Sequence, residues 1–180
     1  MGAPKPLLPW RGATLIEYQV GQLRGGGADE VIVVLGHGAA DVRAFVVGRA
    51  QIVVNNRWTE GRAVSLRAGA ALVPDDASTI VVLNVDQPRP AEVIRRLLDE
   101  HASGGAPVTL PAHGGKRGHP AFLDGSLLTE MRSVTDETEG LRAVVQRHDV
   151  REVAFDDEVV LLDLNTPEDY ERAYAMYGKE

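Results

Sequence analysis

The sequence contains no cysteine, so disulfides and thiolate metal sites are excluded. No apolar run approaches the roughly 20 residues that a membrane-spanning helix needs, and we see no signal peptide at the start of the chain. Basic residues are in the minority, with 19 Lys and Arg against 26 Asp and Glu and a formal net charge of −7. Phosphate backbones are bound by basic faces, so nucleic acid is not an expected partner. We expect a cytoplasmic protein without membrane contact, and a single phosphorylated ligand remains compatible with this charge.

Short apolar runs are the main feature that is present. Residues 31–36 (VIVVLG) and 79–86 (TIVVLNVD) are rich in β-branched side chains, which is typical of strands buried on both faces. Shorter runs of the same kind occupy residues 51–54, 107–111, 151–155 and 159–164. No repeat or linker interrupts them, and 180 residues suffice for one core, so we expect a single domain over residues 1–180.

Helical patterns alternate with these strands. Thr14 and Glu17 form a capping box, residues 90–101 carry an apolar stripe, and Thr166 with Pro167 opens a third helix. This alternation predicts an α/β fold whose sheet is parallel or mostly parallel, with helices on both faces. The stretch from residue 112 to about 132 is rich in loop residues and is expected to project from the sheet.

Ligands of such sheets lie at the carboxyl ends of the strands. Asp86 follows the most hydrophobic of the expected strands, and Pro88 prevents that strand from continuing. It could simply cap the next turn, but a strand-end carboxylate also holds divalent cations in phosphate chemistry, and we favour that interpretation. Asp163 and Asn165 end another strand, and either could supply a second oxygen ligand; the sequence does not decide between them.

Two further stretches combine loop and polar residues. Gly61 and Ser65 lie where a loop turns into a helix, which is equally compatible with an ordinary helix start and with close approach to a planar ligand. Arg117, Gly118 and His119 lie in "GGKRGHP", either a mobile surface loop or a binding site for a substrate phosphate.

These stretches together resemble the MobA-like nucleotidyltransferases, in particular the molybdenum cofactor cytidylyltransferase branch. The matching motifs are "GAPKPLLPW", "VDQP", "KRGHPAFL", "EGLR" and "LDLNTPEDY", in that order along the chain. The resemblance implies a three-layer, Rossmann-like fold of the nucleotide-diphospho-sugar transferase type. It also implies Mg²⁺-assisted transfer of CMP or GMP from CTP or GTP to a phosphorylated acceptor, molybdopterin or the molybdenum cofactor, with release of pyrophosphate.

The resemblance also assigns roles to residues. Lys5 matches the lysine that neutralises the nucleotide phosphates, and Gly2 matches the last glycine of the phosphate loop. Asp86 matches the magnesium ligand, with Asp163 or Asn165 as the second. Gly61 and Ser65 match the base-contacting segment. The acceptor side corresponds to Arg117, Gly118, His119 and Arg142.

The sequence departs from the family pattern at its start. The family opens with a strand and a loop of the form LAAGxSxRMG, whereas this chain begins at the final "MG". We therefore expect the N-terminal strand to be missing, and the strands at 31–36 and 79–86 to present two apolar edges where it would lie.

Other functions also fit parts of the sequence. A chain without the phosphate loop could act as a non-catalytic molybdenum-cofactor-binding protein or as an assembly partner of molybdoenzymes. The acceptor could also be another small phosphorylated molecule. An oxidoreductase is a further alternative, although no G-x-G-x-x-G cofactor loop supports it. Within the resemblance, "SLRAG" and "KRGHP" look more like the cytidylyltransferase branch, which implies CTP rather than GTP.

Overall fold

A computed structural model describes residues 4–135 and 140–179 of the chain. Its strands, in chain order, are β1 (Pro9–Trp10), β2 (Ala13–Thr14), β3 (Ile32–Leu35), β4 (Gln51–Val54), β5 (Thr79–Val82), β6 (Val108–His113), β7 (Lys116–Arg117), β8 (Ala121–Asp124) and β9 (Val150–Ala154). Its α-helices are α1 (Leu15–Gly25), α2 (Ala39–Val46), α3 (Arg62–Ala70), α4 (Ala91–Ala102), α5 (Leu128–Met131), α6 (Leu141–Arg147) and α7 (Pro167–Ala173). Short helical turns complete the chain: η1 (Lys5–Leu7), η2 (Trp58–Glu60), η3 (Gly125–Leu127), η4 (Glu158–Leu161) and η5 (Tyr174–Gly178).

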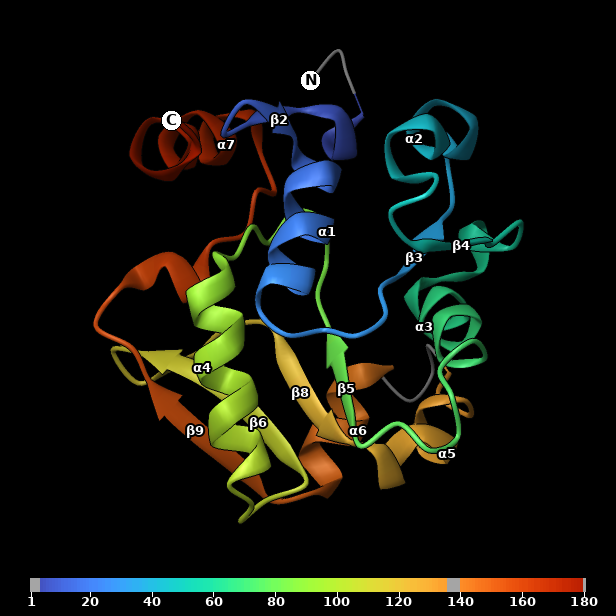
Figure 1. The fold of residues 1–180 in the computed structure, drawn as a ribbon, viewed down its shortest axis with the longest axis vertical. Helices are drawn as coiled ribbons and strands as arrows, with labels where there is room; N and C mark the ends of the chain where they lie inside the picture. Colours follow the sequence, from blue (N-terminus) through green and yellow to red (C-terminus); the bar gives the residue numbers. More distant parts are fainter. Residues whose placement is uncertain (1–3, 136–139, 180) are drawn as a thin grey trace.

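The larger strands are mostly parallel, which confirms the predicted fold class. β8 is antiparallel to both β5 and β6, so β5 and β6 run in the same direction, and β9 is parallel to β6. The short β7 is antiparallel to β6. β3 and β4 form a separate parallel pair, and β1 and β2 form a small antiparallel pair near the N-terminus. Figure 1 shows β3 and β4 on the opposite side of β5 from β6, β8 and β9.

Helices cover both faces of the five-stranded sheet, and β8 shows how the sequence achieves this. Successive side chains of a strand point to opposite faces. Phe122 accordingly packs with Ile94 and Leu97 of α4, whereas Leu123 packs with Met131 of α5. All of these side chains are buried, and each contributes roughly 1.5–3 kcal/mol relative to full exposure. The result is a three-layer α/β arrangement, with α4 on one face and α5 and α6 on the other (Figure 1).

Two expectations about local structure are wrong. Residues 159–164 do not form a strand. Their first three residues belong to η4, and the Asp157 carboxylate caps this turn by accepting from the Val159 backbone N–H. Val159 and Val160 are buried against the α4 layer. These residues are apolar because they are buried and not because they pair with a strand. A short apolar run in the sequence does not distinguish the two cases.

The stretch from residue 112 to 132 does not project as a loop. It contains β8, which lies between β5 and β6 in the middle of the sheet. Only four residues, AFLD, form this strand, and the glycines before it suggested a loop. The sheet nevertheless buries Ala121, Phe122 and Leu123 almost completely, so tertiary packing overrides the local composition.

The capping box at Thr14 is confirmed and supports a testable prediction. The Thr14 hydroxyl accepts from the Glu17 backbone N–H, and the Glu17 carboxylate accepts from the Thr14 N–H at 3.1 Å. Thr14→Ala is expected to lower the free energy of unfolding by about 1 kcal/mol, because α1 loses one of these bonds. Urea denaturation measures this effect, and Thr14→Ser, which keeps the hydroxyl, is the control. Equal stability of Thr14→Ala and the wild type would contradict the capping role.

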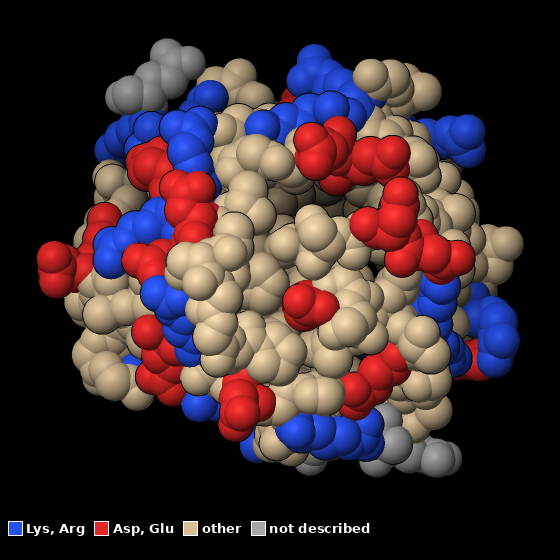
Figure 2. Space-filling view, turned by 60° about the horizontal axis from the view of Figure 1, so that its bottom comes forward, with Lys and Arg blue, Asp and Glu red and all other residues tan. Residues whose placement is uncertain are grey.

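The face of the molecule drawn in Figure 2 carries charged side chains of both signs. In Figure 2, acidic and basic side chains alternate around the rim of the visible face, and its centre is uncharged apart from an isolated acidic residue. Among the described residues, none of the helices combines the length and apolarity needed to cross a membrane.

Candidate functional site

Lys5 and Asp86 meet although they lie 81 positions apart in the chain. Lys5 is in η1, and Asp86 is in the loop between β5 and α4; Lys5 Nζ lies 3.3 Å from Asp86 Oδ2. The side chains are 32% and 16% exposed, so both remain accessible to a ligand. A cation and a carboxylate placed together at the surface offer complementary contacts to a phosphate and to its divalent counterion.

Asp163 lies beside the same loop. Gln87 Nε2 donates to Asp163 Oδ2 at 3.5 Å, and the Leu164 backbone N–H donates to the Asp86 carbonyl at 2.9 Å. Asn165 is exposed, and its backbone N–H donates to the Asp163 carbonyl. Of the two residues that the sequence left open as a second ligand, Asp163 is the one whose side chain contacts the Asp86 loop.

The donor set fits a metal that arrives with a nucleotide. Within residues 4–135 and 140–179, no three His, Asp or Glu side chains are grouped to hold a metal ion by themselves. Mg²⁺ is usually bound by one or two protein carboxylates together with substrate phosphates and waters. Asp86 and Asp163 supply two such carboxylates on adjacent segments.

His119 belongs to the same electrostatic environment. Burial lowers the pKa of His119, and the positive charges of Arg89 and Arg62 lower it further, against the opposing charges of Asp163 and Asp86. The imidazole is therefore neutral at pH 7. The charges of Asp86, Asp163 and Arg62, the first residue of α3, therefore all act on the His119 imidazole.

Arg89 holds the loops of this site together, and sequence reasoning missed it. Its side chain is fully buried, and burial lowers the pKa of Arg89 to about 9, so the guanidinium stays charged at pH 7. It donates hydrogen bonds at 2.8–2.9 Å to the carbonyls of Pro88, His119, Val160 and Leu162. The Asp86 loop, the His119 loop and the segment before Asp163 are thereby fixed to one group. An arginine between two prolines gives no signal in the sequence that it is buried.

Gln19 of α1 adds a second internal connection. Its Nε2 donates to the carbonyls of Asn84 and Gln87, and its Oε1 accepts from the Arg89 backbone N–H. The side chain is buried, so these bonds satisfy groups that cannot reach water. The loop carrying Asp86 therefore rests on α1 from one side and on Arg89 from the other.

The start of α3 positions Ser65. Gly61 precedes the helix with a φ of 117°, a conformation that favours glycine, and Asn55 Nδ2 donates to Ser65 Oγ at 2.9 Å. Asn55 is buried at the end of β4, where its backbone N–H donates to the Leu35 carbonyl of β3. Sequence reasoning found Gly61 and Ser65 but missed Asn55, which orients the serine hydroxyl.

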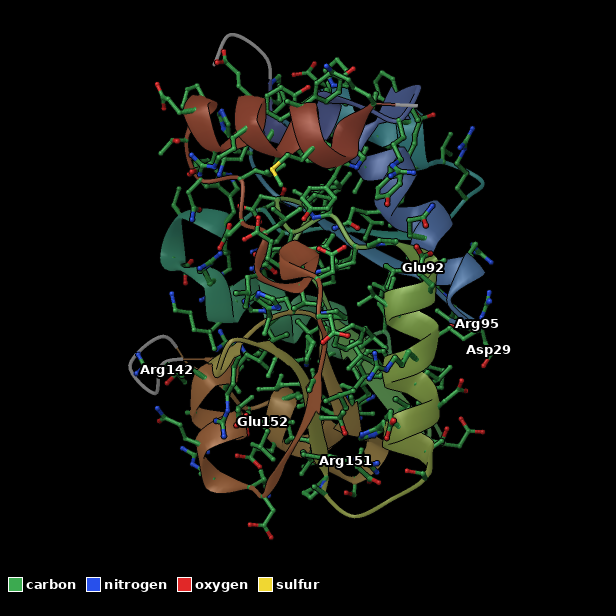
Figure 3. The ribbon with its side chains drawn as sticks, turned by 90° about the vertical axis from the view of Figure 1, so that its left-hand side faces the viewer. Asp29, Glu92, Arg95, Arg142, Arg151 and Glu152 are labelled. Carbon is green, nitrogen blue, oxygen red and sulfur yellow. The ribbon has the colours of Figure 1, made fainter. Side chains whose placement is uncertain are left out.

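The remaining predicted acceptor residues belong to other segments of the fold. Arg117 forms an exposed ion pair with Glu152 of β9 at 2.7 Å. Gly118 is required by packing, because a Cβ there would lie 2.1 Å from the Val160 carbonyl oxygen. Arg142 lies on α6, and Figure 3 shows Arg142 and Glu152 in the lower half of the molecule, away from the end of α4 that carries Glu92. Gly2 lies outside the described residues.

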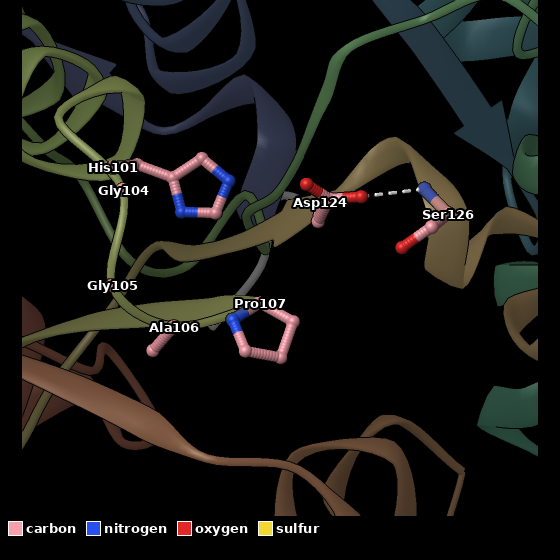
Figure 4. A pocket seen from close by; sticks show the side chains of 7 residues that line it. All are labelled: His101, Gly104, Gly105, Ala106, Pro107, Asp124 and Ser126. Carbon is pink, nitrogen blue, oxygen red and sulfur yellow. Dashed lines mark hydrogen bonds between the residues drawn. The ribbon is translucent and has the colours of Figure 1, made fainter.

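A cavity of about 340 Å³ lies elsewhere in the protein (Figure 4). Its lining includes His101 and Asp124. Asp124 pairs with Thr79, the first residue of β5, whereas Asp86 follows the last residue of that strand. The cavity is therefore at the opposite edge of the sheet from the Lys5–Asp86 pair.

The three-layer α/β fold, with charged residues beyond the carboxyl end of β5, agrees with a nucleotidyltransferase. The family model described as the MobA-like NTP transferase domain matches residues 1–153, and the chain belongs to this family of enzymes. Rv0371c from Mycobacterium tuberculosis H37Rv superposes with a TM-score of 0.83 at 30% identity, over 97% of this chain and 90% of that one. A second structure of Rv0371c, a complex with manganese, gives a TM-score of 0.78 at 32% identity, over 95% and 91% of the two chains.

Two similar proteins with named activities span nearly the whole chain. Nicotine blue oxidoreductase of Paenarthrobacter nicotinovorans is 32% identical over 97% of this chain and 86% of its own length. The molybdenum cofactor cytidylyltransferase of Escherichia coli K12 is 23% identical over 98% of this chain and 90% of its own.

Proposed function

We propose that this protein transfers CMP or GMP from CTP or GTP to a phosphorylated acceptor of the molybdopterin or molybdenum cofactor type, with release of pyrophosphate. The Lys5–Asp86 pair carries the proposal, because an ammonium and a carboxylate, groups able to bind a phosphate and a divalent ion, lie 3.3 Å apart at an accessible point. The manganese complex of Rv0371c supports a divalent metal in a close relative. The name of the Escherichia coli relative supports the acceptor class and CTP.

The residues have distinct tasks in this reaction. An acceptor phosphate oxygen attacks the α-phosphorus of the nucleotide, and the bond from that phosphorus to the bridging oxygen of the β-phosphate breaks. Lys5 binds the departing pyrophosphate and offsets its charge, and Asp86 with Asp163 would hold the divalent ion, which when bound stabilises negative charge on the phosphates. Ser65, oriented by Asn55, contacts the base from the start of α3.

His119 is assigned to the acceptor side. Its imidazole is neutral at pH 7 because burial lowers its pKa, so it donates or accepts one hydrogen bond without bringing a charge. Arg89 fixes its position through the His119 carbonyl at 2.8 Å. Arg117 and Arg142, which lie on β7 and α6, are proposed to contact other parts of the acceptor.

Replacement of Lys5 tests the assigned task of the cation. Lys5→Met is expected to lower pyrophosphate release from CTP or GTP by about 100- to 1,000-fold, the loss typical of removing one preorganised charge-stabilising group. Lys179→Met, which removes an exposed lysine near the C-terminus, is the matched control and is expected to keep full activity. Wild-type turnover by Lys5→Met would contradict the proposed phosphate contact.

An oxidoreductase is the second candidate function, because nicotine blue oxidoreductase is more similar in sequence than the cytidylyltransferase. Such a reaction takes electrons or a hydride from a donor and releases no pyrophosphate. Oxidation of NADH or NADPH without nucleotide cleavage would favour this candidate. Pyrophosphate release that depends on a divalent metal and on a phosphorylated acceptor would exclude it as the main activity.

A further inference from the structure

An exposed aromatic pair lies at the start of the α3 segment. Trp58, the first residue of η2, is 44% exposed, and its indole lies 5.0 Å from the His37 ring, centroid to centroid, at an interplanar angle of 56°. The only other tryptophan in the sequence, Trp10, is 1% exposed and packs among tyrosines. Trp58 therefore leaves in water a large apolar side chain that the core does not use.

The local structure holds Trp58 in place. Gly36, the residue after β3, makes the close approach possible, because a Cβ there would lie 2.9 Å from the Trp58 Cβ. The Arg57 backbone N–H donates to the Asn55 side chain, and Arg57 forms an ion pair with Glu60 across the turn. The same Asn55 side chain orients Ser65. Asn55 therefore connects the residue before Trp58 to Ser65, the residue proposed to contact the nucleotide base.

The pair also connects to the rest of the site. η2 is followed directly by Gly61 and then by Arg62, whose positive charge acts on His119. His119 in turn lies within the electrostatic influence of Asp86 and Asp163. The aromatic pair accordingly lies on the chain segment that leads into Arg62 and so toward His119.

We propose that Trp58, supported by His37, stacks on a planar heteroaromatic ring of a substrate. This inference rests on the proposed function and deepens it by identifying what binds the ring. Bases stack on aromatic side chains with little dependence on base identity, because every base has a π face. The ring belongs to the nucleotide base if Ser65 and Trp58 act together, and to a pterin-type acceptor if they do not.

Tryptophan fluorescence tests the stacking directly, because only two tryptophans are present. Absorption-corrected titrations of the wild type with CTP, GTP, inorganic tripolyphosphate and a free pterin are compared with the same titrations of Trp58→Phe. Quenching by CTP or GTP, absent with tripolyphosphate and absent in Trp58→Phe, is the expected result for a base. Quenching by the pterin alone assigns the ring to the acceptor. No quenching by any aromatic ligand, or equal quenching in Trp58→Phe, would overturn the proposal.

Kinetics separate this inference from the proposed function. Trp58→Leu is expected to raise the KM for the stacked substrate by at least about fivefold, with a smaller change in kcat. Leu72→Ala, which alters another exposed apolar side chain, is the matched control and is expected to leave KM unchanged. Unchanged KM values in Trp58→Leu would overturn the stacking role and leave the transferase intact. Quenching without pyrophosphate release would contradict the proposed transferase activity but support the proposed ring-stacking site.

Discussion

Asp86→Asn is expected to lower the rate of pyrophosphate release by about 100- to 10,000-fold, since a metal ligand supplies several kcal/mol of transition-state stabilisation. The change keeps the shape of the side chain and removes its charge. The hydrogen bond from the Leu164 N–H to the Asp86 carbonyl involves only backbone and is retained. The only side-chain contact of Asp86 described in the structure, the 3.3 Å pair with Lys5, is partly exposed and adds little stability.

The stability of Asp86→Asn distinguishes a functional role from a structural one. Its thermal midpoint is expected to match the wild type, as is that of the control Asp76→Asn, which changes an exposed loop carboxylate. Asp163→Asn is expected to lose activity as well, because Asp163 is the second carboxylate at the same loop. Full activity of Asp86→Asn across a range of Mg²⁺ concentrations would remove this residue from the mechanism.

Arg89→Met is expected to lower the free energy of unfolding by about 3–5 kcal/mol, because it leaves buried carbonyl groups without a donor. Four carbonyls now accept from this guanidinium, and the residue is fully buried. Urea denaturation measures the change. Arg43→Met, at an exposed position on α2, is the matched control and is expected to stay within about 0.5 kcal/mol of the wild type.

Arg89→Lys refines this prediction. The ammonium group keeps the charge but cannot reach four carbonyls with the planar geometry of the guanidinium, so most of the loss is expected to remain. Near-wild-type stability of both Arg89 variants would show that the loops are held by other contacts. Activity is expected to fall with stability, because the His119 carbonyl and the segment before Asp163 both depend on Arg89.

The sequence predicts those elements whose signals are local. β4 occupies residues 51–54 as expected, and the capping boxes of α1 and α7 form at Thr14 and Thr166. Local sequence patterns do not predict the correct element where a buried apolar run has no strand partner, or where a strand forms because of its neighbours in the sheet. The apolar run that forms η4 packs against the α4 layer without a strand partner, and the short β8 is a strand only because β5 and β6 flank it.

The same distinction applies to the site. Asp86 and Asp163 are recognisable because they follow apolar runs that end at the ligand-binding side of a parallel sheet, and Lys5 because it matches a lysine of the MobA-like family. The structure brings these three segments together. Arg89 and Gln19 act through backbone carbonyls of distant loops, so no residue pattern along the chain identifies them. For Arg117 the sequence does not indicate the partner that the structure shows, an exposed ion pair with Glu152 of β9.

Transfer of isotopically labelled α-phosphorus tests the central claim most directly. CTP or GTP carrying the label at the α-phosphate is incubated with the protein, a divalent metal and a molybdopterin-type acceptor, and the products are identified by mass spectrometry. We expect the label to appear in a nucleotidylated acceptor together with an equal amount of unlabelled pyrophosphate, and Asp86→Asn to abolish both. Label that remains in the nucleoside triphosphate, while the acceptor binds unchanged, would contradict the proposed transfer.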